Sequence, residues 1–249
     1  MSSLAPIITL TTDFGTEDGS VGAMKGVVAR LAPSAVVIDV SHDVPRHDVA
    51  AAAWAIAVAS REFPSGTIHV VVVDPTVGGA RAEVVVRTQG QLFVGPDNGA
   101  FAYVTEPDHA AWAITQPSFR MPHAAPTFHG RDVFAPAAAA LASGLPPGAA
   151  GPSTCLHGRL PWSGRATARQ GTIVHIDHFG NLVSNLPGVG GQRIRVGAHE
   201  VPLLRTYADV PPGQALAYVG SAGTIEVAIR EGDARAQLGI ERGAPVEVL

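Results

Sequence analysis

The feature that most constrains this chain is a series of short β-branched runs separated by stretches of helical character. The runs at 6–12, 35–42 and 67–75 are mainly apolar, and the last contains four consecutive valines. Strands that are apolar on both faces are typical of a parallel sheet with helices on each side. The stretches at 19–33 and 46–64 have the length and apolar content of the helices that connect such strands.

The alternation of strand and helix signals continues to about residue 150. We expect a strand at 82–88, two more within 91–104 divided by the turn "GPDNG", and a helix at 130–144. These elements predict an N-terminal α/β domain, residues 1–150, with a mostly parallel central sheet.

The sequence pattern changes at about residue 151 and again at about residue 169. Residues 151–168 are rich in proline and glycine and have no period, so we predict a linker. Residues 169–249 hold seven short strands punctuated by glycine and proline, with one brief helical signal at 233–239. This spacing predicts a smaller C-terminal all-β barrel domain.

Composition excludes several classes of partner. The 249 residues carry a formal net charge of −4, so no broad basic surface for nucleic acid is expected. The longest uncharged run is about a dozen residues, whereas a membrane helix needs roughly 20. Cys155 is the single cysteine and no signal peptide is recognisable, so we expect a soluble, cytoplasmic protein.

Acidic residues mark the ends of the three apolar runs. Asp13, Asp39 and Asp74 lie at or near the edge where an open parallel sheet binds its ligands. Each could instead cap a turn, because aspartate often does so after a strand. Glycine-rich turns beside Asp13 and Asp74 favour a shared site over independent turns.

Two other motifs give no function. The "DFG" at 13–15 lacks the glycine-rich loop, strand lysine and "HRD" that accompany it in kinases, and no phosphate-binding GxxxxGK[ST] is present. The ten histidines show neither metal-ligand spacing nor a cysteine pair, so no metal site is predicted.

Two further segments carry polar clusters. His129 precedes a helix start, where unpaired N–H groups favour an anionic or polarised group, although taken alone an ordinary helix start is the better explanation. Asp177, Phe179 and Asn181 share a tight turn in the second domain. The asparagine amide could read the edge of adenine and the phenyl ring could cover its face. A polar hairpin turn is the alternative.

Together these segments resemble the S-adenosyl-L-methionine (SAM) hydroxide adenosyltransferases, relatives of fluorinase and chlorinase. The matching pieces follow the family's order over nearly the whole chain. They are "TLTTDFG", "VGAMKG", "DVSHDVPRHD", "FPSGTIHVVVVDPTVGGAR", "VGPDNG", "TFHGRDVFAPAAA", "IDHFGNLVSN" and "GSAGTIEVAI".

The resemblance implies a homotrimer whose ligand lies between the N-terminal domain of one subunit and the barrel of its neighbour. It implies that Asp74, Arg81 and His129 surround a water, and it leaves open whether Asp74 or His129 accepts the proton. The halogenating relatives carry a tyrosine where this chain has Asp74. An ionised carboxylate there repels a halide but can orient water, which favours hydrolysis.

The resemblance also implies a set of substrate contacts. Asp13 would bind the ribose hydroxyls, Asp18 and Ser20 the methionine ammonium end, and from the neighbour Asp177 the amino group, Asn181 (with Phe179) the adenine and Ser221 the carboxylate. The chain departs from the halogenases at His47, where they have tryptophan, and at Ala222, where they have arginine.

The leading hypothesis is therefore an enzyme that hydrolyses SAM to adenosine and L-methionine without a cofactor, since SAM is the substrate. One alternative is a sensor that binds SAM or adenosine with little turnover, and another is a halogenase acting at C5′.

Overall fold

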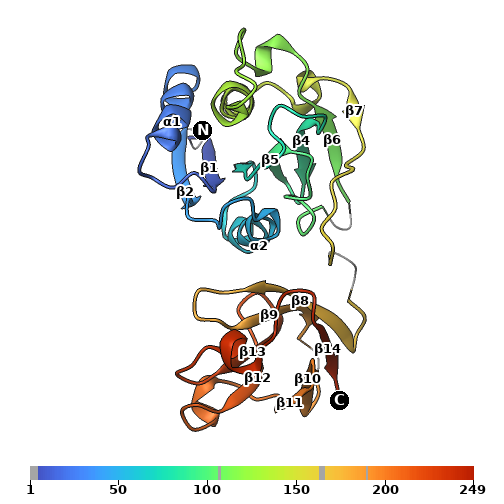
Figure 1. Cartoon of the computed structure of the whole chain (residues 1–249). Helices are drawn as coiled ribbons and strands as arrows, with labels where there is room; N and C mark the ends of the chain where they lie inside the picture. Colours follow the sequence, from blue (N-terminus) through green and yellow to red (C-terminus); the bar gives the residue numbers. More distant parts are fainter. Residues whose placement is uncertain (1–4, 106–107, 163–165, 189) are drawn as a thin grey trace. The chain divides into compact units, whose positions relative to one another are not determined.

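The computed structural model describes residues 5–105, 108–162, 166–188 and 190–249, and it divides into two compact units (Figure 1). Unit 1 is Met1–Leu160 and unit 2 is Pro161–Leu249. Part of the predicted linker 151–168, residues 163–165, lies outside the described residues. At its start, Ser153–Thr154 form a strand of unit 1, because they pair with the strand Ala110–Ala113.

Unit 1 contains a seven-stranded sheet in the order β2-β1-β3-β5-β4-β6-β7. The first four strands of this order are parallel, and β4, β6 and β7 are antiparallel to their neighbours. The α/β class predicted from the apolar runs is thus confirmed. The strands are β1 Ile7–Thr12, β2 Val36–Ser41, β3 Ile68–Val72, β4 Glu83–Thr88, β5 Gln91–Pro96, β6 Ala110–Ala113 and β7 Ser153–Thr154.

Helices cover both faces of this sheet (Figure 1). α1 (Ser20–Leu31) and α3 (Ala135–Ala142) share one core with Val70 and Val72, while α2 (Val49–Ala59) shares a second core with Val71 and Val73. Successive strand side chains point to opposite faces, so a run of valines supplies both cores. Short 3₁₀ segments lie at Ser60–Glu62, Pro117–Phe119 and Pro147–Ala150, and a π-helical turn at Gly130–Phe134 leads into α3.

One strand expected within 91–104 does not form. After β5 the chain turns instead, with Ala102 N donating to Gly99 O at 3.0 Å and Val104 N to Phe101 O at 3.1 Å. Both edges of β4 are taken by β5 and β6, so the apolar residues of this segment are buried as turns in the α2-side core. Apolar content alone does not distinguish the two outcomes.

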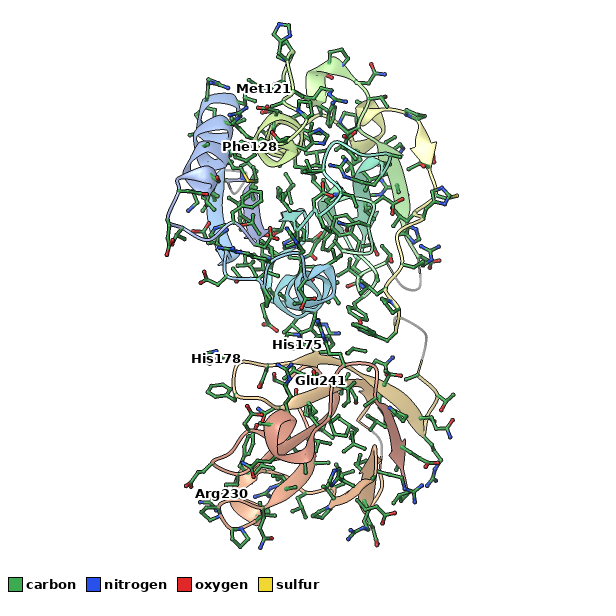
Figure 2. All side chains as sticks on the ribbon, in the orientation of Figure 1. Met121, Phe128, His175, His178, Arg230 and Glu241 are labelled. Carbon is green, nitrogen blue, oxygen red and sulfur yellow. The ribbon has the colours of Figure 1, made fainter. Side chains whose placement is uncertain are left out.

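Unit 2 is a barrel-like antiparallel sheet in the order β11-β10-β14-β8-β9-β13-β12, which confirms the predicted all-β module. A bridge between Leu203 and Ala217 brings the two ends of this order together. Side chains fill the interior of each unit (Figure 2). The elements are β8 Gln170–Ile176, β9 Leu182–Pro187, β10 Arg193–Val196, β11 His199–Pro202, the 3₁₀ turn Tyr207–Asp209, β12 Ala215–Val219, β13 Thr224–Ile229, α4 Ala234–Leu238 and β14 Pro245–Val248.

No helix in the described part of the chain is long and apolar enough to cross a membrane.

A histidine lies fully buried in the parallel part of the unit 1 sheet. The ring of His69 stacks on Phe93 with centroids 4.9 Å apart, and its Nδ1 lies 2.7 Å from the hydroxyl of Thr9. Burial lowers the pKa of His69 to about 4, against a smaller raising effect of Gln91. The ring is therefore neutral in the folded protein down to this pH.

This buried ring predicts a loss of stability in mild acid. The unfolded chain binds a proton at His69 below about pH 6.5, whereas the folded chain does not until about pH 4. The free energy of unfolding should fall over that window, by about 2 kcal/mol from this group at pH 5. In urea titrations at pH 7 and pH 5, His69→Gln should lose less stability between the two pH values than the wild type. The exposed-site variant His123→Gln should behave as the wild type. An equal loss in His69→Gln and the wild type would contradict the assignment.

Candidate active site

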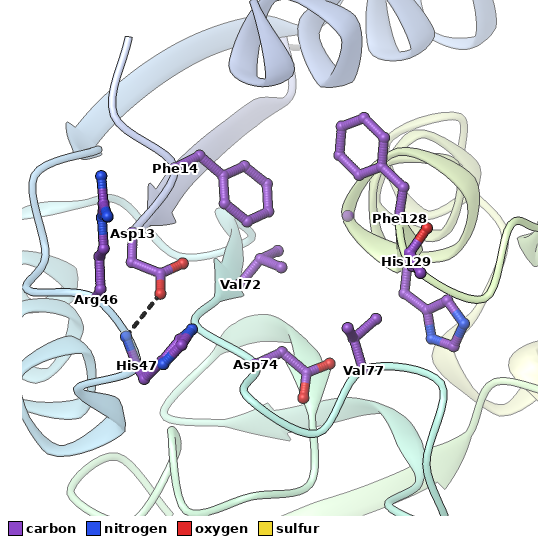
Figure 3. A pocket seen from close by; sticks show the side chains of 11 residues that line it. Asp13, Phe14, Arg46, His47, Val72, Asp74, Val77, Phe128 and His129 are labelled. Atoms are coloured by element: carbon purple, nitrogen blue, oxygen red, sulfur yellow. Dashed lines mark hydrogen bonds between the residues drawn. The ribbon is translucent and has the colours of Figure 1, made fainter. Parts of the chain in front are cut away.

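A pocket of about 240 Å³ opens at the carboxyl ends of β1 and β3, the edge where an open parallel sheet binds ligands. Figure 3 shows Asp13 and His47 on one side, Phe128 and His129 on the other, and Asp74 between them. Charged and apolar side chains share the walls, so the pocket suits a polar reacting group attached to an apolar body. Its lining comprises Asp13, Phe14, Arg46, His47, Val72, Asp74, Val77, Thr127, Phe128, His129 and Gly130.

The loop after β3 brings Arg81 back to Asp74. Turns within the loop are closed by Val77 N donating to Asp74 O at 3.2 Å and by Gly79 N donating to Thr76 O at 2.9 Å. Gly78 has φ of 76°, and a Cβ there would stand 2.7 Å from the carbonyl oxygen of Pro126. Glycine is thus needed both for the backbone conformation and for the close approach to the segment that precedes His129.

Asp74 and Arg81 form a buried ion pair. Nε of Arg81 donates to Oδ2 of Asp74 at 2.9 Å and Nη2 donates to the same oxygen at 2.5 Å. The two side chains are only 4% and 7% exposed, so water screens the pair little. The second carboxylate oxygen, Oδ1, has the hydroxyl of Thr76 at 3.3 Å. The arginine therefore holds one oxygen of Asp74 and leaves the other the better placed for a ligand.

His129 joins the pair through the same guanidinium. Its Nδ1 lies 2.8 Å from Nη2 of Arg81, and arginine can only donate, so Nδ1 accepts and the ring proton is on Nε2. Burial lowers the pKa of His129, and the charge of Arg81 lowers it further. Glu83 and Asp74 act in the opposite direction and Arg120 adds a small lowering effect. The ring is a neutral donor at Nε2.

Glu83, the first residue of β4, is part of this cluster and was missed from the sequence. Its Oε1 accepts from Nη1 of Arg81 at 3.0 Å and lies 3.0 Å from Nδ1 of His129. The guanidinium of Arg81 donates to both of these acceptors, so its charge offsets the repulsion between them. With neutral His129, two carboxylates and one guanidinium give the cluster a net charge of −1. A charged residue at the head of the apolar strand 83–88 was the available signal, but strands often begin with one.

Asp13 follows β1 on the other side of the pocket. Its Oδ2 accepts a hydrogen bond from the backbone N–H of His47 at 2.9 Å. His47 has φ of 65°, a conformation that is uncommon outside glycine. The structure thus brings Asp13 into the same pocket as Asp74 and His129.

Asp18 lines a hollow next to this pocket, whereas Ser20 does not. A second hollow of about 400 Å³ shares Asp13, Phe14 and Arg46 with the first and includes Asp18. Oδ1 of Asp18 accepts from the backbone N of Ser20 at 3.1 Å, and this bond lowers the pKa of the exposed Asp18 carboxyl. Ser20 is the first residue of α1 and is not among the residues that line either hollow.

Asp39, the third acid of the predicted edge, does not join the pocket. It lies within the edge strand β2, where Oδ2 accepts from Lys25 at 2.6 Å and Oδ1 lies 3.0 Å from Nε2 of His42. Within the described residues, no group of three or more histidine, cysteine, aspartate or glutamate side chains is arranged to hold a metal ion.

In unit 2, Phe179 and Asn181 line a pocket of about 370 Å³ together with Tyr207, Ile229, Glu231 and Gly232. Asp177 lies behind it, with Oδ1 accepting from the backbone N–H groups of Phe179 and Asn181, each at 2.9 Å. Phe179 is 73% exposed although its side chain is large and apolar. Ser221 is exposed on the β12–β13 turn and does not line this pocket.

Family models match both units. Residues 8–151 match the SAM hydroxide adenosyltransferase N-terminal domain, and residues 171–247 match the C-terminal domain of the same family.

Individual relatives match over almost the full chain. A protein of Thermus thermophilus named (R)-S-adenosyl-L-methionine hydrolase is 41% identical over 99% of this chain and 100% of its own. A more distant relative from Actinoplanes sp., named fluorinase, is 28% identical over 90% of each chain. The crystal structure of an uncharacterised conserved protein from Thermotoga maritima superposes with a TM-score of 0.87 at 34% identity, covering 97% of this chain and 100% of that one.

The cluster geometry predicts the protonation of His129. In ¹⁵N-detected NMR of the histidine side chains, His129 should carry its proton on Nε2 at pH 7, because Arg81 donates to Nδ1. Its pKa should lie below the ordinary 6.5, and Glu83→Gln should lower it further by removing a charge that favours the cation. His129→Gln assigns the signal. A proton on Nδ1, or titration above 6.5, would contradict this geometry.

Proposed function

The chain belongs to the SAM hydroxide adenosyltransferase family, and from that membership we propose that it hydrolyses SAM to adenosine and L-methionine. The observation that carries the proposal is the buried cluster of Asp74, Arg81 and His129 at the pocket that also contains Asp13. These groups can orient water beside a bound sugar.

The chemistry needs one oriented nucleophile. The oxygen of water attacks C5′, the C5′–S bond breaks, and sulfur leaves with the bonding electrons as a neutral thioether. The proton lost by water is the only charge left to place. Because the sulfonium already is a good leaving group, the reaction needs no metal or organic cofactor. Holding water in line with the C5′–S bond supplies a large part of the acceleration.

Asp74 is the proposed proton acceptor. Arg81 holds its Oδ2, which leaves Oδ1 to receive a hydrogen bond from water. His129 is suited to a different task, because its Nδ1 is occupied by Arg81 and Nε2 is a donor. We assign it the orientation of water or of a ribose oxygen. General-base catalysis by Asp74 would raise the rate by about 10²–10⁴-fold.

The remaining contacts complete the substrate site. Asp13 binds the ribose hydroxyls, and Asp18 and Ser20 bind the methionine end. Phe179 and Asn181 hold the adenine, with Asp177 and Ser221 at the methionine end, all from the barrel of a neighbouring subunit in a homotrimer. The exposed ring of Phe179 beside a pocket supports this role for the turn.

We also propose that the enzyme acts in the cytoplasm. Support comes from the single cysteine, Cys155, which excludes an intramolecular disulfide and fits a reducing compartment.

The test is product identification. Purified protein incubated with SAM should yield adenosine and methionine in equal amounts, at rates unchanged by EDTA, chloride or fluoride. A 5′-halo-5′-deoxyadenosine would show a halogenase instead. Binding of SAM with no product after many hours would show a sensor, and either result would overturn the proposal.

Substitutions in the cluster should separate catalysis from binding. Asp74→Asn keeps the shape but removes the charge that orients and deprotonates water, so kcat should fall by about 10²–10⁴-fold. The dissociation constant for SAM should stay within about threefold, because Asp74 acts on water. Asp39→Asn, on the edge strand outside the pocket, is the matched control and should retain the wild-type kcat. Wild-type turnover in Asp74→Asn would remove the residue from the mechanism.

A further inference from the structure

A chain of side-chain hydrogen bonds runs through unit 2 behind the exposed turn. The hydroxyl of Tyr218 donates to Oε2 of Glu226 at 2.6 Å, the hydroxyls of Tyr218 and Tyr207 are 2.5 Å apart, and Nδ2 of Asn181 donates to the hydroxyl of Tyr207 at 3.1 Å. Glu226 and Tyr218 do not line the pocket, while Tyr207 and Asn181 do. The chain thus connects an inner carboxylate to the wall of a pocket.

The carboxylate of Glu226 sets the donor-to-acceptor direction of this series of hydrogen bonds. Each tyrosine hydroxyl has one proton to donate, and an ionised carboxylate can only accept. Tyr218 gives its proton to Glu226, so its oxygen accepts from Tyr207, and the oxygen of Tyr207 accepts from the amide of Asn181. Burial, together with Glu226 and Tyr207, raises the pKa of Tyr218, so its hydroxyl stays protonated.

A second acceptor fixes the same amide. Nδ2 of Asn181 also donates to Oδ2 of Asp177 at 2.8 Å. Both hydrogens of the amide are therefore used inside the barrel, one by Asp177 and one by Tyr207. What Asn181 can offer a ligand is its amide oxygen, an acceptor. Although free asparagine could read both a donor and an acceptor on adenine, this asparagine can only receive an N–H.

We propose that Glu226 and Tyr218 are positioning residues that fix the amide of Asn181 with its oxygen toward the pocket. The pocket then selects a purine with an amino group at C6 over one with a carbonyl there. The inference rests on the proposed function, because it assumes that the base of the substrate occupies this pocket.

The selectivity follows from the cost of two facing acceptors. A 6-amino group donates to the amide oxygen, whereas a 6-carbonyl places one lone pair against another and leaves both groups unsatisfied. Sites built to hydrogen-bond one substrate group reject the analogue without it strongly. Without Tyr218 the hydroxyl of Tyr207 loses its acceptor and can turn its proton toward the amide, so the amide can tilt or turn and the penalty on the carbonyl falls.

The experiment uses the full chain and two probes, adenosine and inosine, which differ at C6. Calorimetry gives the ratio of their dissociation constants. We choose pH 8 because burial raises the pKa of Glu226, against a lowering effect of the Tyr218 hydrogen bond and with a smaller raising effect of Asp177. The wild type should bind adenosine at least about 30-fold more tightly. Tyr218→Phe should lower this ratio at least about fivefold, while kcat at saturating SAM stays within about twofold, because the variant leaves the water site intact.

Two further variants make the result specific. Glu226→Leu removes the acceptor of the Tyr218 proton, so it should lower the same ratio even if Tyr218→Phe fails to fold. Tyr103→Phe removes a hydroxyl in unit 1 and should leave the ratio unchanged. An unchanged ratio in both barrel variants, or a wild type that prefers neither nucleoside or binds neither, would overturn the inference. The ratio is read without turnover, whereas failure of the proposed function would appear as intact SAM.

Discussion

The site depends on one guanidinium that joins three side chains from separate parts of unit 1. Arg81 donates to Asp74 through Nε and Nη2, to Glu83 through Nη1, and to His129 through Nη2. Breaking such a buried set by removing one partner leaves an uncompensated charge, which costs several kcal/mol. The arrangement thus fixes the orientation of the Asp74 carboxylate and the tautomer of His129 together.

The fold supplies the geometry that this guanidinium needs. The valines of β3 are buried on both faces, so the end of the strand, and with it Asp74, is held rigidly at the sheet edge. Gly78 then lets the loop pass close to Pro126 before it returns as Arg81. In unit 2 a carboxylate has a comparable role, because Glu226 directs a chain of hydroxyl groups toward Asn181. In both units a charged group orients the neutral one that would meet the substrate.

The sequence predicted elements whose signals are local. The strand of the valine run and the seven short strands of unit 2 are each encoded by neighbouring residues, and all of them are present in the structure. The glycines after Asp74 lie in a turn, as their local sequence predicts. Glu83, the tyrosine chain and the exclusion of Asp39 depend on contacts between distant segments, such as the contact between Arg81 and His129, which are 48 positions apart. The turns at 100–104 replaced a predicted strand because the sheet offered no open edge there. Their positions at strand ends brought Asp13 and Asp74 into one hypothesis, and the order of the family motifs added His129 to it.

The central claim is that Asp74 orients water and does not itself attack C5′. A single turnover with enzyme in excess over SAM in H₂¹⁸O, followed by mass spectrometry of adenosine, tests it directly. Direct attack by water predicts that adenosine carries ¹⁸O at its 5′-oxygen in the first turnover. If Asp74 formed an ester that water then opened at the carbonyl, the first adenosine would carry ¹⁶O from the carboxylate. That result would contradict the account.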